Sequence, residues 1–310
     1  MIYLTGDTHG GCDTKKLVSR KVAETIHAGD VLIICGDFGF VYDYKKESGK
    51  EKTWLDWFKD RPWTTVFVDG NHECFPRLYA YPEKEWCGGK VHEIRPNLFH
   101  LIRGEMYTIE GHTFFAMGGA RSHDRGPAKG DTKAVIGKHW WPEEVASLEE
   151  QEKGLETLKA HENQVDYIIT HCLPTRLQDR QTEGKFPPDE MSNYLEKIKD
   201  VATFEHWYCG HYHVDRDLTE DISILFNKII PLGEKVQGSD PIVGSPIYQK
   251  RQSVQFKDAG GVEMLGIIKN VYPWGMMKDH TQPLYDIIVS DGTGREIKFV
   301  GERSIISVIR

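Results

Sequence analysis

The sequence predicts an α/β domain followed by a small β-rich domain. Continuous apolar runs such as 31–35 (VLIIC) are typical of strands covered on both faces. Between these runs, apolar residues recur with helical spacing, as they do over 15–27. A stretch rich in Gly, Pro and Ser at 232–245 precedes a series of short strand-like runs. We therefore predict an α/β domain over 1–235, and a linker with a small β-barrel-like domain over 236–310.

Each expected element follows from a local pattern. Alternation over 98–117, with a turn at Glu110-Gly111, predicts hairpin-like strands. Pro142 stands at the favoured first-turn position and predicts a helix that runs to about Ala160. The other strands of the larger domain are expected at 1–5, 31–35, 64–68, 165–170, 204–209, 222–226 and 228–231, and its other helices at 15–27, 52–60 and 189–199. In the smaller domain, strands are expected at 262–271, 284–289, 296–300 and 304–309.

The composition argues against some classes of protein. The 39 Lys and Arg residues stand against 47 Asp and Glu, so the net charge is −8. A mildly acidic chain is a poor candidate for binding nucleic acid mainly through charge, although a local basic groove stays open. The six cysteines form no CxxC pair or regular framework, and no apolar run is long enough to span a bilayer. Since the sequence begins directly with a strand, we expect a soluble cytoplasmic protein.

Metal-binding types of side chain follow several of the predicted strands. In chain order they are Asp7 and His9, Asp37, Asn71 with His72, His171, and His211 with His213. Ligands gather at the carboxyl ends of strands in an open α/β sheet, so these side chains are expected to converge. For any one of the histidines, a hydrogen-bonded core residue is the commoner explanation. Their recurrence at strand ends favours a metal centre.

Two metal sites can be built from this set. One ion would be held by Asp7, His9 and His213, and the other by Asn71, His171 and His211. Asp37 would bridge the two ions through its two oxygens. Oxygen ligands mixed with imidazoles suit Mn²⁺, Fe, Zn²⁺ or Ni²⁺, and no thiolate is needed. Two such ions, about 3.5–4 Å apart, polarise a phosphoryl oxygen and generate hydroxide at neutral pH.

The ordered series of motifs resembles the calcineurin-like metallophosphoesterase superfamily over about residues 1–230. The motifs are G-D-x-H-G at 6–10, G-D at 36–37, G-N-H-E at 70–73, His171 and G-H-x-H at 210–213. The resemblance implies a four-layer αββα sandwich, in which two mixed β-sheets face each other between helices. It implies that the metal ligands are Asp7, His9, Asp37, Asn71, His171, His211 and His213. It also implies that His72 is the general acid, although a residue that only orients a neighbouring ligand is the alternative. Mn²⁺ is our favoured ion.

The second motif departs from part of this superfamily. Its Ser/Thr protein phosphatases resemble G-D-x-x-D-R-G there, with an Arg that grips the phosphate. The present chain has GDFGF at 36–40 and no Arg. Arg121, which follows the strand expected to end near Met117, is our candidate for the missing phosphate clamp, and His123 is a second candidate.

The leading functional hypothesis is a binuclear-metal phosphoester hydrolase, with phosphodiesters favoured as substrates. A metal-bridged hydroxide would attack phosphorus while His72 assists the leaving group. One alternative is a phosphomonoesterase or a Ser/Thr-type protein phosphatase, and another is a non-catalytic metal-binding scaffold. We expect a nucleotide or another small phosphodiester as the substrate, while nucleic acid stays open. The C-terminal module is a candidate for binding nucleic acid, for gating the site or for oligomerisation, and its near-neutral charge favours the last two.

Overall fold

Two mixed β-sheets form the centre of the larger unit in the computed structural model, which describes residues 1–122, 140–236, 248–272 and 284–309. The seven-stranded sheet has the order β13 (Ile230–Pro231), β1 (Ile2–Thr5), β2 (Val31–Cys35), β3 (Thr64–Val68), β6 (Leu98–Leu101), β5 (Gly89–Arg95) and β4 (Glu83–Trp86). The six-stranded sheet has the order β11 (Arg216–Asp217), β12 (Ile222–Ile224), β10 (His206–Cys209), β9 (Tyr167–Thr170), β8 (His112–Met117) and β7 (Glu105–Ile109). Strands β1, β2, β3 and β6 run parallel, and so do β8, β9, β10 and β12. Each sheet therefore gathers several carboxyl ends at one edge.

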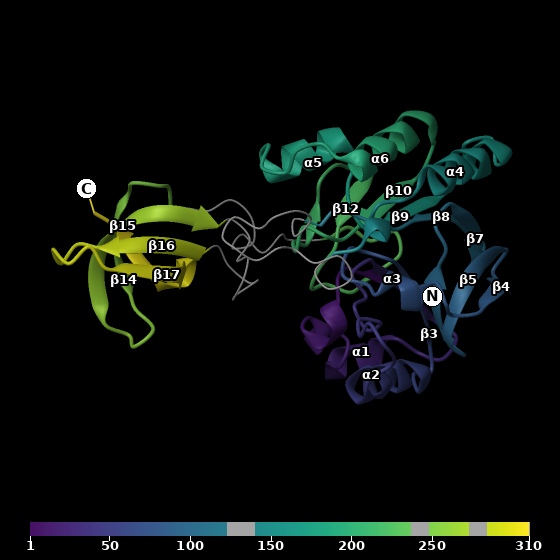
Figure 1. The fold of residues 1–310 in the computed structure, drawn as a ribbon, viewed down its shortest axis with the longest axis horizontal. Helices are drawn as coiled ribbons and strands as arrows, with labels where there is room; N and C mark the ends of the chain where they lie inside the picture. The colour runs from purple at the N-terminus through teal and green to yellow at the C-terminus, as the bar shows by residue number, and fades with distance from the viewer. Residues whose placement is uncertain (123–139, 237–247, 273–283, 310) are drawn as a thin grey trace. The chain divides into compact units, whose positions relative to one another are not determined.

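Helices cover the outer face of each sheet (Figure 1). On one side lie α1 (Arg20–Thr25) and α2 (Gly49–Lys59), and on the other lie α4 (Leu148–Ala160), α5 (Thr175–Thr182) and α6 (Glu190–Val201). The short helix α3 (Phe75–Leu78) follows the β3 exit. The order of layers is thus helix, sheet, sheet, helix, as predicted.

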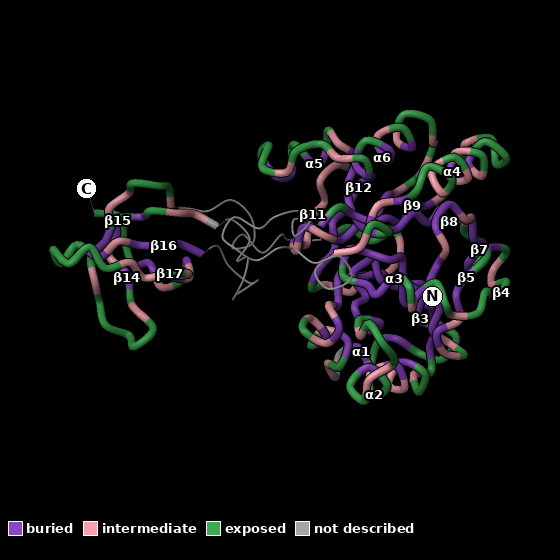
Figure 2. Tube along the Cα trace, in the orientation of Figure 1, coloured by how far each residue is buried: buried purple, intermediate pink, exposed green. Residues whose placement is uncertain are grey.

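Strand β1 shows how the sequence builds these layers. Ile2 and Leu4 pack into the core between the two sheets, together with residues such as Tyr107 and Tyr208. Tyr3 points to the opposite face and packs with residues of α1 and α2. Because both faces are covered, β1 and β2 are buried along their whole length, while exposed residues lie mostly on helices and loops (Figure 2). This explains the continuous apolar runs in the sequence.

The prediction of three successive hairpin-like strands over 98–117 is wrong in one respect. Strands β7 and β8 pair as an antiparallel hairpin. Strand β6, however, lies in the other sheet, parallel to β3 and antiparallel to β5. Alternation along a strand records which faces are buried, and it carries no information about the strand's neighbour.

Two helices begin later than predicted. Pro142 starts a short 3₁₀ turn, Pro142–Glu144, and α4 begins only at Leu148. Ser147 caps α4, since its hydroxyl accepts a hydrogen bond from Glu150 N at 3.2 Å and Glu150 accepts one from Ser147 N at 2.7 Å. The helix predicted over 15–27 is likewise divided into a 3₁₀ turn, Thr14–Lys16, and α1, which Ser19 caps.

Several short elements were not predicted. They are α3, β4, β5, α5, β11 and, in the smaller unit, β14 (Ser253–Lys257). The largest gap in the prediction is 75–95, where β4 pairs with β5 and β5 extends the sheet beyond β6. Strand β4 is largely exposed and lacks an apolar pattern, so periodicity could not reveal it.

The chain divides into two compact units. The first comprises Met1–Tyr212 and Asp217–Val236, and the second Gln237–Arg310 with His213–Arg216. The second contains an antiparallel sheet of β17 (Glu296–Gly301), β16 (Leu284–Val289), β15 (Glu263–Tyr272), β14 and β18 (Ile305–Val308), in that order. A short 3₁₀ turn, Glu302–Ser304, joins β17 to β18. This sheet has a core of its own, which includes Phe256, Tyr285 and Ile287. Among the described helices, none has the length and apolar character needed to cross a membrane.

A buried ion pair fixes the connection that runs from β6 in one sheet to β7 in the other. Arg103, in the connection from β6 to β7, donates from Nε to Asp69 Oδ2 at 3.0 Å, and Asp69 directly follows β3. His100 Nε2 lies 3.0 Å from the other oxygen of Asp69. Arg103 also donates to the backbone oxygen of Glu143 at 2.7 Å and faces Glu150 of α4 at 3.3 Å. Burial by itself would raise the pKa of Asp69, but the charge of Arg103 and the hydrogen bond with His100 hold it well below its usual range.

We predict that Arg103→Met destabilises the protein strongly. The substitution removes the cation and leaves the Asp69 carboxylate buried, so the free energy of unfolding should fall by about 3–5 kcal/mol. Urea denaturation followed by circular dichroism measures this change. Arg176→Met is the matched control, because Arg176 is 69% exposed and its ion pairs are screened by water. An Arg103→Met protein as stable as this control would contradict the prediction.

Candidate metal centre

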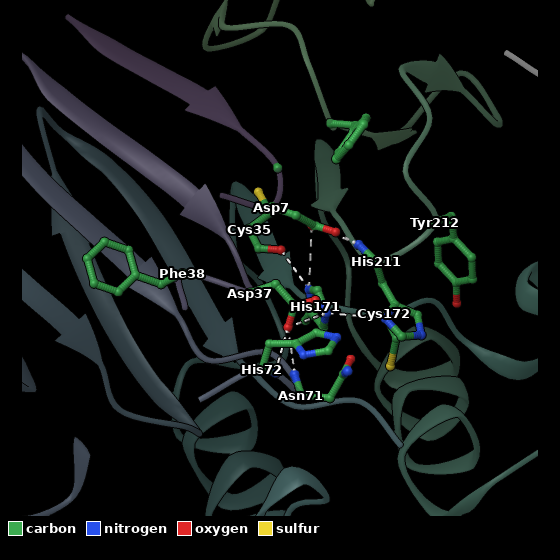
Figure 3. Close-up of polar contacts among 12 residues, drawn as sticks. Asp7, Cys35, Asp37, Phe38, Asn71, His72, His171, Cys172, His211 and Tyr212 are labelled. Carbon is green, nitrogen blue, oxygen red and sulfur yellow. Dashed lines mark hydrogen bonds and ion pairs between the residues drawn. The ribbon is translucent and has the colours of Figure 1, made fainter. Parts of the chain in front are cut away.

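The candidate ligands lie where strand ends of the two sheets meet. Asp7, Asp37 and Asn71 follow the neighbouring parallel strands β1, β2 and β3. His171 and His211 follow β9 and β10 of the other sheet. Figure 3 shows Asp37, His171 and His211 turned toward a common centre, with His72 and Asn71 beside it. The convergence predicted from the strand ends is therefore present in the structure.

Three overlapping groups of side chains have their ligand atoms within 4.8 Å of one another. These groups are Asp7 with His9 and His213, His9 with Asp37 and His72, and Asp37 with His171 and His211. Asp37 belongs to two of the groups and so connects them. Asn71 joins the site through its backbone N–H, which donates to Asp37 Oδ1 at 2.8 Å.

The carboxylate of Asp37 is the hub of the arrangement. It is 1% exposed, and its Oδ1 accepts hydrogen bonds from Asn71 N at 2.8 Å and His72 N at 2.9 Å. His171 Nε2 lies 3.3 Å from the same oxygen, while His9 Nε2 lies 3.1 Å from Oδ2. Burial would raise the pKa of Asp37, but the facing imidazoles of His171 and His72 hold it well below its usual range. The group therefore stays an anion at the centre of the site.

Two imidazoles are oriented for metal binding by their outer nitrogens. His171 Nδ1 donates to the backbone oxygen of Cys35 at 3.0 Å, which leaves Nε2 facing Asp37 and His211. His9 Nδ1 donates to Asp13 Oδ2 at 2.7 Å, which leaves Nε2 facing Asp37. A metal-binding histidine usually donates its other N–H in this way, to a carboxylate or a carbonyl. Asp13 was not predicted, and its spacing of four residues from His9 is the only signal that could have indicated it.

The charge balance of the site favours cations. Burial would lower the pKa of His9, but hydrogen bonds to Asp13 and Asp37 raise it to about 11. The pKa of His171 is raised to about 9, because the charge of Asp37 outweighs burial. Asn71 Oδ1 is a buried oxygen that accepts no hydrogen bond from the described residues. Buried carboxylates, oriented imidazole nitrogens and an unused amide oxygen are a donor set that fits divalent metal ions.

The backbone at the site is held in an uncommon conformation. His9, Asp37, His211 and His213 have φ values of 43°, 45°, 69° and 51°. For residues other than glycine, this left-handed region costs about 1 kcal/mol or more each, and such strain is concentrated at functional sites. These candidate ligands therefore lie in tight turns within four residues of the strands that precede them.

Two glycines make room for the carboxylates. A Cβ at Gly70 would lie 2.1 Å from Asp37 Oδ1, and one at Gly210 would lie 2.2 Å from Asp7 Oδ1. No side chain fits at either position without displacing a carboxylate. The glycines that precede Asn71 and His211 in their motifs therefore serve the ligands of other strands.

The remaining predicted residues lie around this centre. His72 is exposed, and its ring centroid is 5.2 Å from that of His9. Arg121 lines a cavity of about 220 Å³ together with His211 and Phe186, and its guanidinium lies 3.2 Å from Glu190. His123 lies outside the described residues.

Glu73 lies next to the centre but turns away from it. It is buried and accepts hydrogen bonds from Gly39 N at 3.1 and 3.2 Å. Burial raises its pKa well above the usual value, and the charge of Asp37 raises it further. Its hydrogen bonds to Gly39 N fix the backbone of the second motif.

Comparison with known proteins agrees with this geometry. The family model described as calcineurin-like phosphoesterase matches residues 1–215 of the 310-residue chain. No curated protein shows significant similarity to this chain. The matched region contains every residue placed around the centre above. The chain belongs to the calcineurin-like phosphoesterase family, the members of which use divalent metal ions to hydrolyse phosphoester bonds.

Proposed function

We propose that this protein is a binuclear-metal phosphodiesterase. The observation that supports it best is the sharing of Asp37 between ligand groups of the two sheets. In this proposal one ion is held by Asp7, His9 and His213, and the other by Asn71, His171 and His211, with Asp37 between them. Mn²⁺ is the favoured ion, and Fe, Zn²⁺ and Ni²⁺ suit the same donors. Such ions supply Lewis-acid stabilisation of the phosphoryl oxygens and a water nucleophile that is active at neutral pH.

His72 is the proposed general acid. It is exposed, so its imidazole is accessible to a substrate, and its ring lies within reach of the Asp37 and His9 ligand atoms. Its backbone N–H is fixed by the 2.9 Å hydrogen bond to Asp37. A proton on its ring would pass to the leaving oxygen as the bond to phosphorus breaks.

The surroundings of Asp37 favour a diester over a monoester. Phe38 and Phe40 of the second motif are completely buried, so this motif contributes no cation to the substrate. Arg121 is the proposed phosphate contact, and its side chain is 43% exposed. A phosphodiester carries one negative charge where a monoester carries up to two, so it needs fewer cations for binding. The cavity lined by Arg121, Phe186 and His211 offers space for one of its ester groups.

We predict hydrolysis of bis(p-nitrophenyl) phosphate with a higher kcat/KM than that of p-nitrophenyl phosphate. Activity should disappear after chelation and return with Mn²⁺, and Asp37→Asn should remove it because the shared ligand loses its charge. Metal content, measured by mass spectrometry, should be two ions in the native chain. Asp60→Asn is the control, since Asp60 is a 64% exposed carboxylate at the end of α2.

Other results of this experiment would point to the alternatives. A higher kcat/KM for the monoester would favour a phosphomonoesterase or a Ser/Thr-type protein phosphatase. Bound metal without turnover of either substrate would indicate an interaction scaffold. Turnover by the chelated protein or by Asp37→Asn would contradict the metal mechanism itself.

For His72→Asn, we predict a loss of activity that depends on the leaving group. A dinucleotide, which releases a ribose hydroxyl, needs a proton and should be cleaved about 10²–10⁴-fold more slowly. Bis(p-nitrophenyl) phosphate releases a stable phenolate and should lose much less. His161→Asn is the control, because His161 is exposed at the end of α4. Equal losses for both substrates would rule out the general-acid role.

For Arg121→Ala, we expect KM for diesters to rise about tenfold, which is the effect of losing one charged hydrogen bond. Because Arg121 would bind phosphate in the ground state as well as in the transition state, kcat should change little. Arg180→Ala, on the exposed side of α5, is the control. An unchanged KM on every hydrolysed substrate would remove Arg121 from the site.

A further inference from the structure

A lysine lies behind the candidate metal centre and contacts three backbone oxygens. Lys16 Nζ donates to Gly6 O at 2.8 Å and to Asp7 O at 2.6 Å. It also donates to the backbone oxygen of Phe226. Gly6 and Asp7 follow β1 of the seven-stranded sheet, whereas Phe226 follows β12 of the six-stranded sheet. One ammonium group thus joins the exits of strands from different sheets, at the residue that supplies the first carboxylate.

The three oxygens need hydrogen-bond donors at this point. Carbonyl oxygens carry partial negative charge, so three that converge on one position repel each other unless a donor lies between them. The two segments approach each other closely here, since a Cβ at Gly6 would lie 1.9 Å from Leu225 O. The lysine ammonium has three N–H donors, which matches the three acceptors. The aliphatic stem reaches the site from the 3₁₀ turn Thr14–Lys16.

The carboxylate of Asp7 depends on this backbone. Asp7 is completely buried, and its Oδ1 accepts a hydrogen bond from His211 N at 3.0 Å. Lys16 holds the carbonyl groups of Asp7 and of the residue before it, so it restricts the peptide planes that aim the side chain. We propose that Lys16 is a positioning residue, which acts through Asp7 to set the affinity of the centre for metal ions. This inference rests on the proposed metal-dependent function.

The positive charge of Lys16 by itself would weaken metal binding, whereas its positioning of Asp7 would strengthen it. A cation this close to the centre repels metal ions, so an influence through charge alone predicts tighter binding after its removal. A positioning role predicts weaker binding. Loss of a group that orients a metal ligand typically lowers metal affinity 10–100-fold. The direction of the change therefore separates the two explanations.

The test is a titration of the metal-free full-length chain with Mn²⁺, in which free Mn²⁺ is measured by electron paramagnetic resonance. For Lys16→Met we expect the dissociation constant of at least one ion to rise about 10–100-fold. Lys15→Met, an exposed neighbour with the same loss of charge, should change it less than about twofold. Unchanged or tighter Mn²⁺ binding by Lys16→Met would overturn the proposal.

A double-mutant cycle tests the dependence on Asp7. In an Asp7→Asn background, Lys16→Met should weaken Mn²⁺ binding by a much smaller factor than in the native chain, because the ligand it positions is already impaired. Equal factors in the two backgrounds would mean that Lys16 does not act through Asp7.

A second variant keeps the test informative if Lys16→Met does not fold. Lys16→Arg retains the positive charge and the N–H donors, so it should bind Mn²⁺ more tightly than Lys16→Met. If Lys16→Met is unfolded, the dissociation constant of Lys16→Arg for Mn²⁺ should lie within about tenfold of that of the native chain. A folded Lys16→Arg with no measurable Mn²⁺ affinity would overturn the proposal. Failure of the proposed function has a different signature, since the native chain would then bind Mn²⁺ without hydrolysing diesters, or would bind none.

Discussion

The candidate centre depends on one buried carboxylate. Asp37 is surrounded by two backbone N–H groups from the β3 exit and by imidazoles from both sheets, at 2.8–3.3 Å. An anion in such a place is stable only if donors and cations surround it closely. The same requirement brings together the strand ends that carry the candidate ligands. The contacts that define the geometry of the centre are therefore also contacts that hold the two sheets together.

This convergence requires strained backbone at several candidate ligands, and nearby residues stabilise that strained backbone. Several candidate ligands adopt left-handed φ values, while Gly70 and Gly210 leave space that any side chain would fill. Lys16 connects the exits of strands from the two sheets through carbonyl oxygens, and Arg103 joins the β6–β7 connection to the buried carboxylate after β3. Strain at the centre is held in place by contacts made behind it.

The family gives the reaction class, and the local environment suggests how this chain uses it. The second motif buries two phenylalanines where related phosphatases are expected to present a cation. The proposed phosphate contact, Arg121, comes instead from the loop after β8 and lines a cavity together with the candidate ligand His211. The proposed phosphodiester substrate would carry a single negative charge and an organic group on each side.

The sequence by itself determined the layered α/β class, most of the buried strands and the identity of the candidate ligands, because apolar runs ending in Asp, Asn or His are visible locally. Tertiary structure decided which sheet each strand joins: β6 leaves its apparent hairpin because pairing depends on partners, while alternation records only burial. It also decided which groups support the ligands. Asp13, Arg103, Lys16 and the carbonyl of Cys35 were not foreseen, since a contact with a distant backbone atom leaves no pattern in the sequence of either segment.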